Sequence, residues 1–321
     1  MTDDRLIGRR EALKRGIGGV AAGAMLALDR RLAGGLSPTS QATGLIERPI
    51  PSTGEKLPVV GIGTARSYEQ AGTPEQMATL RDVLREFPRL GGRVIDTAPS
   101  YGAAESIVGD GLEALGNRDK YFIATKVSLR SSGGRDAATQ QMEQSARRLH
   151  TDRIDLLQIW NVSNPELLIP ALDDWKSANR IRYTGITSSF KGQYAELEDV
   201  IRKHKLDFLQ VDLAIDNRSA QERVIPAAAD RGMAVLINLP FGRTRVFQRV
   251  QGKPLPDWAR DIDATSWAQV FLKYIIGNPT VTAVIPGTAT LEYLKDNMGA
   301  AHGRVPDAAL RRRIEQYFDA L

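Results

Sequence analysis

Three side chains suited to proton transfer stand at the ends of two apolar runs in this chain. Residues 94–97 and 122–126 are short stretches rich in apolar and β-branched residues and bounded by polar and turn residues, a pattern typical of buried strands. Asp96 and Lys126 emerge at the carboxyl ends of these runs, and Tyr101 lies in the loop just beyond the first. A nearby ammonium favours the phenolate and is expected to lower the pKa of the tyrosine, while the aspartate keeps the lysine charged and in place. We therefore predict that Tyr101 is a general acid–base group, with Lys126 and Asp96 as its partners.

Each of these residues also has a structural interpretation. Asp96 would cap the segment after its strand, Tyr101 would pack on its own loop, and Lys126 would be a strand-end charge. Structural ion pairs are common, so any one of the three taken alone favours this alternative. Their occurrence together, in this order and at predicted strand ends, favours the catalytic interpretation.

The chain alternates short apolar runs with helix-prone stretches. Eight runs have the character of strands: residues 59–63, 94–97, 122–126, 154–160, 183–187, 208–213, 234–239 and 282–286. Helix-prone stretches between them include residues 74–90, 103–115, 137–149, 194–204, 220–231 and 266–276. Alternation at intervals of about thirty residues indicates parallel βαβ units, and eight units predict an α/β fold, a closed (β/α)8 TIM barrel. An open doubly wound sheet is the structural alternative, but no G-x-G-x-x-G follows the first run.

Two further stretches precede the first barrel run. Residues 46–50 and 56–60 flank a turn at residues 51–54, which predicts a β-hairpin. In barrel enzymes the active site lies at the carboxyl ends of the strands, where the three reactive residues are predicted to be. A chain of 321 residues with 42% hydrophobic content has ample core for one domain.

The stretch D-T-A-x-x-Y-G at residues 96–102, followed by Lys126, resembles the corresponding part of the aldo/keto reductases. Residues 148–159, 181–187 and 284–287 are also similar to the pattern of this family, and the resemblance extends from about residue 46 to about residue 300. It implies that the N-terminal hairpin closes the barrel bottom and that Tyr101 is the acid. It also implies NADP(H) as the cofactor, with NAD(H) as the alternative, and a small-molecule carbonyl or alcohol substrate.

The resemblance assigns cofactor-binding residues position by position. Thr187 and Ser188 stand where the family has a Ser-Asn pair that holds the nicotinamide carboxamide, and Gln210 matches a glutamine beside it. Asn238 stands where the family has an aromatic residue that stacks on the nicotinamide. Polarity of strand ends and helix surfaces is the structural alternative. The remaining assigned positions are Gly287 and Thr288, near the adenosine 2′-phosphate, and Asp296 and Asn297, near the adenine.

Arginines after the seventh run offer a contact to phosphate. Arg243, Arg245 and Arg249 lie within residues 241–258, a loop long enough to fold over a pyrophosphate. Ordinary solvated charge is the alternative. This loop and residues 161–168 are expected to be irregular and to determine substrate specificity.

The largest departure from the family pattern is Trp160. The substrate-orienting histidine of the family would stand at this position, and none of the three histidines in the chain replaces it. An indole N–H donates a hydrogen bond, but an indole cannot accept a proton or carry charge. We expect Trp160 to contact the substrate, either as a bulky lid or as a stacking surface for a flat or sugar-like molecule. Loss of one polarising donor weakens catalysis by a few kcal/mol rather than abolishing it.

Two functions remain open at this point. The first is an oxidoreductase that transfers a hydride between NADP(H) and a carbonyl or alcohol substrate, with Tyr101 as general acid–base. The alternative is a noncatalytic or decayed nucleotide-binding barrel that has lost the orienting histidine and the stacking aromatic residue. Metal-dependent hydrolysis is less favoured, and no metal site is predicted, because the chain has no His-x-His motif.

The N-terminal segment has the composition of an export signal. Arg9 and Arg10 precede an apolar, glycine-rich stretch at residues 16–28, which is too short to span a bilayer. This pattern resembles a twin-arginine signal, and cleavage after Ala42 is expected. We predict an export signal and linker at residues 1–42, a barrel at residues 43–321, no stable membrane span, and export to the periplasm by the twin-arginine machinery. A basic amphipathic helix or an unstructured tail is the alternative.

The charge balance gives no sign of nucleic-acid binding. Residues 1–42 hold seven basic and four acidic residues, so only +2 of the total net charge of +5 belongs to the remaining chain. The chain has no cysteine, which excludes disulfides, thiolate metal sites and cysteine nucleophiles.

Overall fold

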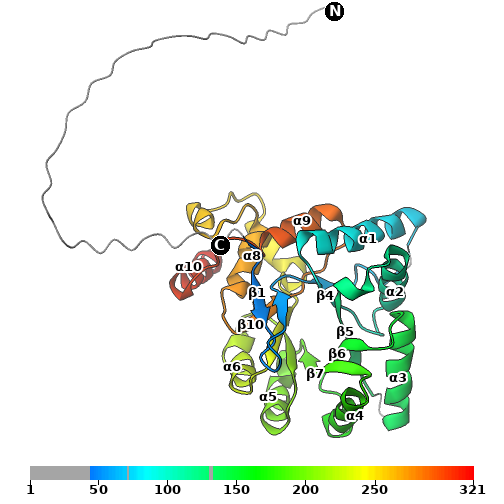
Figure 1. Ribbon diagram of the computed structural model, residues 1–321. Coiled ribbons are helices and arrows are strands. Elements are labelled where there is room, and N and C mark those ends of the chain that lie inside the picture. The colour runs from blue at the N-terminus through cyan, green and yellow to red at the C-terminus, as the bar shows by residue number, and fades with distance from the viewer. Residues whose placement is uncertain (1–43, 71, 130–132) are drawn as a thin grey trace, which may run out of the picture. The chain divides into compact units, whose positions relative to one another are not determined.

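Eight parallel strands form the core of the protein (Figure 1). The computed structural model describes residues 44–70, 72–129 and 133–321, so the predicted export segment and its boundary lie outside the described residues. Each strand is hydrogen-bonded to the next in the order β3 to β10, and each overlaps one predicted run. The strands are β3 (Ile62–Gly63), β4 (Val94–Asp96), β5 (Phe122–Val127), β6 (Ile154–Trp160), β7 (Ile181–Ser188), β8 (Phe208–Asp212), β9 (Ala234–Asn238) and β10 (Val281–Val284).

The first and last strands meet and close the barrel. Parallel bridges join Val60 to Val284 and Gly63 to Gly287, and the Gly63 N–H donates to the Pro286 carbonyl at 2.9 Å. A Cβ atom on Gly63 would lie 2.8 Å from the Ile285 carbonyl oxygen, so this approach requires a residue without a side chain. The prediction of a (β/α)8 barrel is confirmed.

A hairpin covers the amino-terminal end of the barrel, as predicted. Strands β1 (Glu47–Pro49) and β2 (Lys56–Pro58) pair antiparallel. Ile50 and Leu57 are fully buried and pack in one cluster with side chains from the barrel interior, including Phe122. The hairpin thereby closes the floor of the barrel with apolar side chains.

Ten α-helices are found in the described residues, and they overlap all six predicted helical stretches. The first illustrates why they form: Thr73 accepts a hydrogen bond from the Gln76 N–H, Gln76 accepts one from the Thr73 N–H, and Pro74 begins the helix. The helices are α1 (Pro74–Glu86), α2 (Ala104–Leu115), α3 (Arg135–Arg148), α4 (Pro165–Ser177), α5 (Tyr194–Lys203), α6 (Val224–Asp230), α7 (Arg245–Val250), α8 (Trp267–Ile276), α9 (Leu291–Gly299) and α10 (Ala308–Asp319). Across the described residues, no helix has the length and apolar character that crossing a membrane demands.

The two loops expected to be irregular contain helices. Helix α4 begins at Pro165, inside residues 161–168, and α7 together with the start of a 3-10 helix (Asp257–Ile262) lies inside residues 241–258. The prediction was wrong there for a local reason. Asn164, with φ of 52°, precedes α4 in the left-handed region, and α7 has only six residues, fewer than two helical turns.

The hairpin is fastened to the last βα unit by Arg48. Its guanidinium donates to the Asn278 carbonyl at 2.8 Å and also to the carbonyls of Ile276 and Val281. Carbonyls at the carboxyl end of a helix have no partner within the helix, and a cation is favourable there. Arg48 therefore supplies hydrogen bonds that α8 cannot make itself and holds the barrel floor in place.

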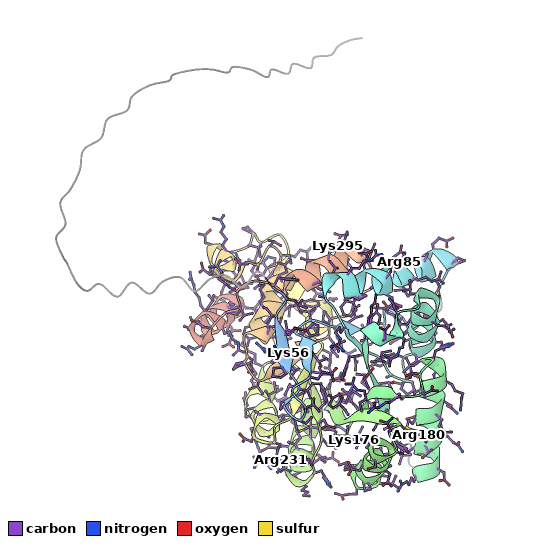
Figure 2. All side chains as sticks on the ribbon, in the orientation of Figure 1. Lys56, Arg85, Lys176, Arg180, Arg231 and Lys295 are labelled. Carbon is purple, nitrogen blue, oxygen red and sulfur yellow. The ribbon has the colours of Figure 1, made fainter. Side chains whose placement is uncertain are left out.

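We expect Arg48→Ala to lower the free energy of unfolding by about 2–4 kcal/mol, because it removes three part-buried hydrogen bonds to main-chain carbonyls. Urea unfolding followed by circular dichroism measures this. The matched control is Arg231→Ala, because Arg231 is exposed on the outer surface (Figure 2) and makes one long contact, 3.4 Å, to the His204 carbonyl. Equal stability of the two variants would show that the hairpin is held by its apolar side chains alone.

Candidate active site

The barrel interior changes from apolar to polar along its axis. Side chains alternate between the interior and the helices, so each interior position lies two residues beyond the last. On β5 the apolar Ala124 is followed, at the next interior position toward the carboxyl end, by Lys126. In the same way Leu156 is followed by Gln158 on β6, and Phe208 is followed by Gln210 on β8. Together with Asp96 and Thr187, which are also buried, these form a polar layer at the carboxyl end of the strands. We call these five residues, Asp96, Lys126, Gln158, Thr187 and Gln210, the polar layer.

The carboxylate of Asp96 is the centre of the polar layer. Lys126 Nζ lies 2.8 Å from both carboxylate oxygens and donates also to the Thr97 carbonyl at 2.8 Å. Gln210 Nε2 donates to Asp96 Oδ1 at 2.7 Å, and Gln158 Nε2 lies 3.4 Å from the same atom. The two charges are buried, with 5% and 2% of their side chains exposed, and this set of partners satisfies them.

Tyr101 joins this pair from the loop after β4. Lys126 Nζ lies 5.1 Å from the centroid of the tyrosine ring. The loop is held against the loop after β3, where the Ala103 N–H donates to the Glu69 carbonyl at 2.9 Å. Gly102, with φ of 53°, makes this approach possible, since a Cβ there would lie 2.2 Å from the Glu69 carbonyl oxygen. The structure thus brings the three predicted catalytic residues together.

The expected lowering of the Tyr101 pKa was wrong. Lys126 is the largest influence and does lower the pKa of Tyr101, but burial and the carboxylates of Asp96 and Glu69 together raise it above its ordinary value. Burial lowers the pKa of Lys126, but Asp96 and Tyr101 outweigh it, and the pKa is raised. At neutral pH the phenol therefore keeps its proton and the ammonium keeps its charge, which suits Tyr101 to donate a proton.

A cavity of about 480 Å³ opens at the carboxyl end of the barrel, and we call it the mouth cavity. Six residues singled out in the sequence line it: Asp96, Tyr101, Trp160, Asn238, Arg243 and Gly287. This volume is typical of small-molecule sites.

The residues predicted to hold the carboxamide do not line the mouth cavity. Thr187 donates to Gln210 Oε1 at 2.9 Å, while Gln210 in turn donates to Asp96. Ser188 is fully buried and donates to Gln193 Oε1 at 2.7 Å. Their polar groups are thus occupied by neighbours within the barrel.

Of the residues predicted near the adenosine, Gly287 lines the mouth cavity, whereas Thr288, Asp296 and Asn297 do not. Thr288 is buried and accepts a hydrogen bond from Asn297 Nδ2 at 3.1 Å. Asp296 accepts from Ser266 Oγ and Gln269 Nε2, both at 2.9 Å.

Only one of the three loop arginines faces the mouth cavity. Arg243 lines it, whereas Arg245 is paired with Asp216 at 2.9 Å. Arg249 lies over the ring of Phe318, 4.7 Å from its centroid, and does not line the mouth cavity. Of this group, Arg243 is left for contact with a ligand there.

Trp160 separates the mouth cavity from a smaller one. It is the last residue of β6 and lines both cavities. The smaller cavity has a volume of about 130 Å³ and is lined also by Ser100, Lys126 and Gln141. The indole therefore lies between the two cavities, and the expected contact of Trp160 with the substrate stays a prediction.

Several residues that line the mouth cavity escaped the sequence reasoning. Arg66, Ser67 and Glu69 come from the loop after β3, and Phe190, 53% exposed, comes from the loop after β7. Their position directly after barrel strands was a usable signal, because barrel sites are built from such loops. A second signal is visible only in three dimensions: non-glycine residues with positive φ gather at the mouth, among them Arg66, Asn161, Leu239, Arg243 and Thr244.

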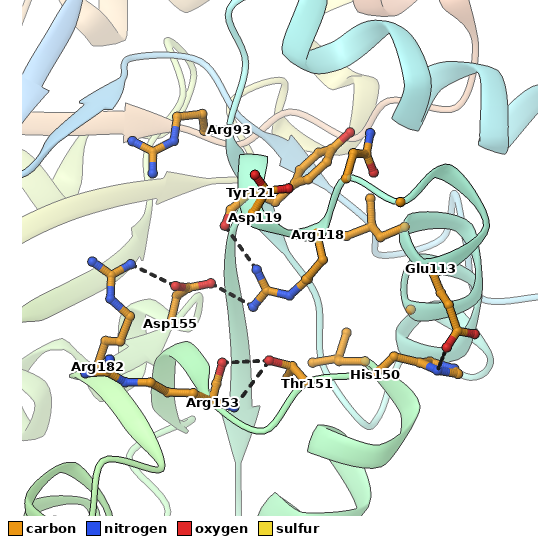
Figure 3. Close-up of a pocket in the computed structure, with 15 residues that line it drawn as sticks. Arg93, Glu113, Arg118, Asp119, Tyr121, His150, Thr151, Arg153, Asp155 and Arg182 are labelled. Carbon is orange, nitrogen blue, oxygen red and sulfur yellow. Dashed lines mark hydrogen bonds and ion pairs between the residues drawn. The ribbon is translucent and has the colours of Figure 1, made fainter.

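A larger cavity, about 610 Å³, lies at the opposite end of the barrel (Figure 3). Its charged groups are largely paired with each other: Asp155 accepts from Arg118 at 2.9 Å and from Arg182 at 2.8 Å. Asp155 also accepts from the Ile123 N–H and so holds the start of β5. These contacts are structural, and this end of a barrel contributes to stability rather than to chemistry. The mouth cavity, which holds the proton-transfer group, is the candidate active site.

Comparison with known proteins identifies the family of the chain. The model of the aldo/keto reductase family matches residues 59–315, so the chain belongs to the aldo/keto reductase family of oxidoreductases. Methylglyoxal reductase YeaE of Escherichia coli (strain K12) is 29% identical over 266 residues, which cover 81% of this chain and 91% of that protein. The aldo-keto reductase YhdN of Bacillus subtilis (strain 168) is 29% identical over 206 residues, covering 59% of this chain and 60% of that protein.

Solved structures show the same fold at low identity. An aldo-keto reductase from Bacillus halodurans in its holo form superposes with a TM-score of 0.69 and 22% identity, covering 86% of this chain and 96% of that one. An aldo-keto reductase from Klebsiella pneumoniae in complex with NADPH has a TM-score of 0.69 and 23% identity, covering 85% of this chain and 96% of that one.

Proposed function

We propose that the protein is an oxidoreductase that uses NADP(H) to reduce the carbonyl group of a small molecule, with Tyr101 as general acid. The observation that carries this proposal is the contact of Tyr101 with the buried pair Lys126–Asp96 at the wall of the mouth cavity. The similarity to a methylglyoxal reductase supports a carbonyl substrate, and the NADPH complex of a structural neighbour supports the cofactor.

The mouth cavity fits the nicotinamide end of a dinucleotide. It has room for a ring and a small carbonyl compound, and the amide of Asn238 and the guanidinium of Arg243 line it. The Asn238 Oδ1 atom is buried without a partner in the described residues, which a hydrogen-bond donor on a ligand would correct. Arg243 would face the phosphates.

Tyr101, Lys126 and Asp96 together carry out the proton transfer. When bound, the dinucleotide supplies the hydride that adds to the carbonyl carbon. Tyr101 donates its phenolic proton to the carbonyl oxygen, so the alcohol forms as the tyrosine O–H bond breaks. The ammonium of Lys126 stabilises the phenolate that is left, and Asp96 keeps that ammonium in place. In the oxidation direction the same phenolate accepts the proton of the alcohol.

A noncatalytic nucleotide-binding barrel is the second candidate. Two observations favour it: Trp160 stands at the position of the orienting histidine, and Asn238 stands at the position of the stacking aromatic residue. The two candidates differ in turnover. Oxidation of NADPH with a panel of small aldehydes supports the oxidoreductase, whereas dinucleotide binding without any turnover supports the second candidate.

We expect Tyr101→Phe to lower the rate of carbonyl reduction by about 10²-fold or more, because it removes the proton donor but keeps the ring. Stopped-flow measurement of NADPH oxidation gives the rate, and fluorescence titration gives the dinucleotide affinity, which should stay nearly unchanged. Tyr121→Phe is a matched control, since Tyr121 lies at the opposite end of the barrel. An unaltered rate in Tyr101→Phe would refute the assignment.

We expect Trp160→His to raise kcat/KM toward small aldehydes by about 10-fold or more, because it places a polarising donor at the substrate. The imidazole is smaller than the indole, and the 130 Å³ cavity behind Trp160 lets it adjust. The control is Trp160→Phe, which removes the N–H and should give no gain. A lowered melting temperature without a gain in rate would instead show that Trp160 serves packing.

We propose further that the protein is exported to the periplasm in a folded state by the twin-arginine route. Arg9 and Arg10 followed by the short apolar stretch support this. Replacement of both arginines by lysine should leave the protein in the cytoplasm, as fractionation and immunoblotting would show. Periplasmic recovery of this double variant would contradict the proposal.

An exported reductase needs to retain its dinucleotide, because the periplasm lacks a cytoplasmic supply of reduced cofactor. Protein purified from the periplasm should therefore carry NADP(H) through gel filtration, and Arg243→Ala should release it. Arg245→Ala is the control, because Arg245 is paired with Asp216. Active exported protein that is consistently empty would refute tight retention.

A further inference from the structure

The side-chain amide of Asn238 occupies an unusual position in the active site. Asn238 is the last residue of β9, two residues beyond the interior Leu236, and it lines the mouth cavity. Its Oδ1 atom is buried, yet it has no hydrogen-bond partner among the described residues. A buried acceptor without a donor destabilises the folded protein, so such an atom calls for an explanation.

Most hydrogen-bonding groups of the polar layer are already used by the protein, and Gln158, whose Oε1 atom has no partner among the described residues, does not line the mouth cavity. Asp96 accepts hydrogen bonds from Lys126 and Gln210, and Gln210 accepts one from Thr187. Ser188 is engaged with Gln193. None of these groups is left to recognise a neutral polar ligand without breaking the polar layer.

A second amide, that of Asn161, lines the mouth cavity, and its Oδ1 atom is also buried without a partner among the described residues. Asn161 follows β6 in a loop, with φ of 54°, whereas Asn238 belongs to a strand that is hydrogen-bonded to β8 and β10 on its two sides. Groups on a strand are positioned more accurately than groups on a loop. Asn238 is therefore the better candidate for recognition of a ring that has to lie accurately beside Tyr101.

We infer that Asn238 Oδ1 accepts a hydrogen bond from the carboxamide N–H of the nicotinamide, in place of Thr187, Ser188 and Gln210. This inference rests on the proposed use of a nicotinamide dinucleotide. The carboxamide is the hydrogen-bonding group of the nicotinamide ring, and its NH₂ is a donor that matches an unpartnered carbonyl oxygen. Because Oδ1 is buried, this hydrogen bond requires rotation of the asparagine amide about χ2, a soft torsion, which turns Oδ1 toward the cavity and moves Nδ2 into its place.

The test compares two ligands with the purified full-length protein after removal of any bound dinucleotide. The ligands are NADP⁺ and its 3-acetylpyridine analogue, in which a methyl ketone replaces the carboxamide and the N–H donor is lost. Quenching of tryptophan fluorescence reports binding without any turnover, and Trp160 lines the cavity. We expect the wild-type protein to bind NADP⁺ roughly 2- to 10-fold more tightly than the analogue, the net worth of one hydrogen bond.

Variants of Asn238 and Ser188 show which residue causes the preference for NADP⁺ over the analogue. Asn238→Leu should lose affinity for NADP⁺ but not for the analogue, so that the preference disappears, and Asn238→Ala should behave in the same way if the larger side chain disturbs folding. Ser188→Ala, at the position that the sequence favoured, should keep the preference. Thermal unfolding of each variant confirms that it is folded.

The outcomes separate this inference from the proposed function. A wild-type protein that binds NADP⁺ and the analogue equally overturns the inference but leaves the oxidoreductase proposal intact. A preference that survives in both Asn238 variants and disappears in Ser188→Ala also overturns it. Failure to bind any nicotinamide dinucleotide overturns the proposed function itself.

Discussion

The buried carboxylate of Asp96 is the interaction on which the active site depends. It neutralises Lys126, whose side chain is 2% exposed, and it receives hydrogen bonds from glutamines on β6 and β8. Removal of one partner of a buried ion pair leaves an uncompensated charge, which destabilises a protein by about 3–5 kcal/mol. The same carboxylate thus holds three strands in register at their carboxyl ends and fixes the charge beside Tyr101. Stability and chemistry share one network here, so they cannot be altered independently.

The other parts of the barrel are stabilised by contacts that do not involve the polar layer. Below the polar layer the interior is apolar, with the rings of Phe122, Tyr183 and Phe208 packed at centroid distances of 5.5–5.8 Å. At the floor, Glu55 in the hairpin turn pairs with Arg182, and the Tyr183 hydroxyl donates to the same carboxylate at 2.7 Å. Apolar packing and the floor ion pairs therefore hold the barrel from one end, while the other end presents polar groups to the mouth cavity.

Strands and strand-end residues could be predicted from the sequence, because they depend on a local pattern of residues. The run at residues 154–160 coincides with β6, because five of its seven residues are apolar and polar residues flank it. Asp96, Tyr101 and Lys126 could be assigned together because strand ends converge at one face of a barrel. The roles of Thr187 and Gln210 could not be checked in this way, since their hydrogen-bond partners come from other strands. The direction of the Tyr101 pKa failed for a related reason: burial and Glu69, from a separate loop, outweigh the lysine.

The link between Arg48 and the carbonyls at residues 276–281 has a consequence for the order of assembly. The two partners are separated by about 230 positions, so the hairpin is among the first parts of the barrel to be synthesised and its anchor among the last. Contacts between such distant parts of a chain form late, after the intervening units have folded. The barrel floor therefore stays open while the ribosome is still at work, and a prematurely terminated chain cannot close it. A closed floor marks a chain that has been synthesised at least as far as residue 281, and an export route that accepts only folded cargo would thereby reject molecules that end before it.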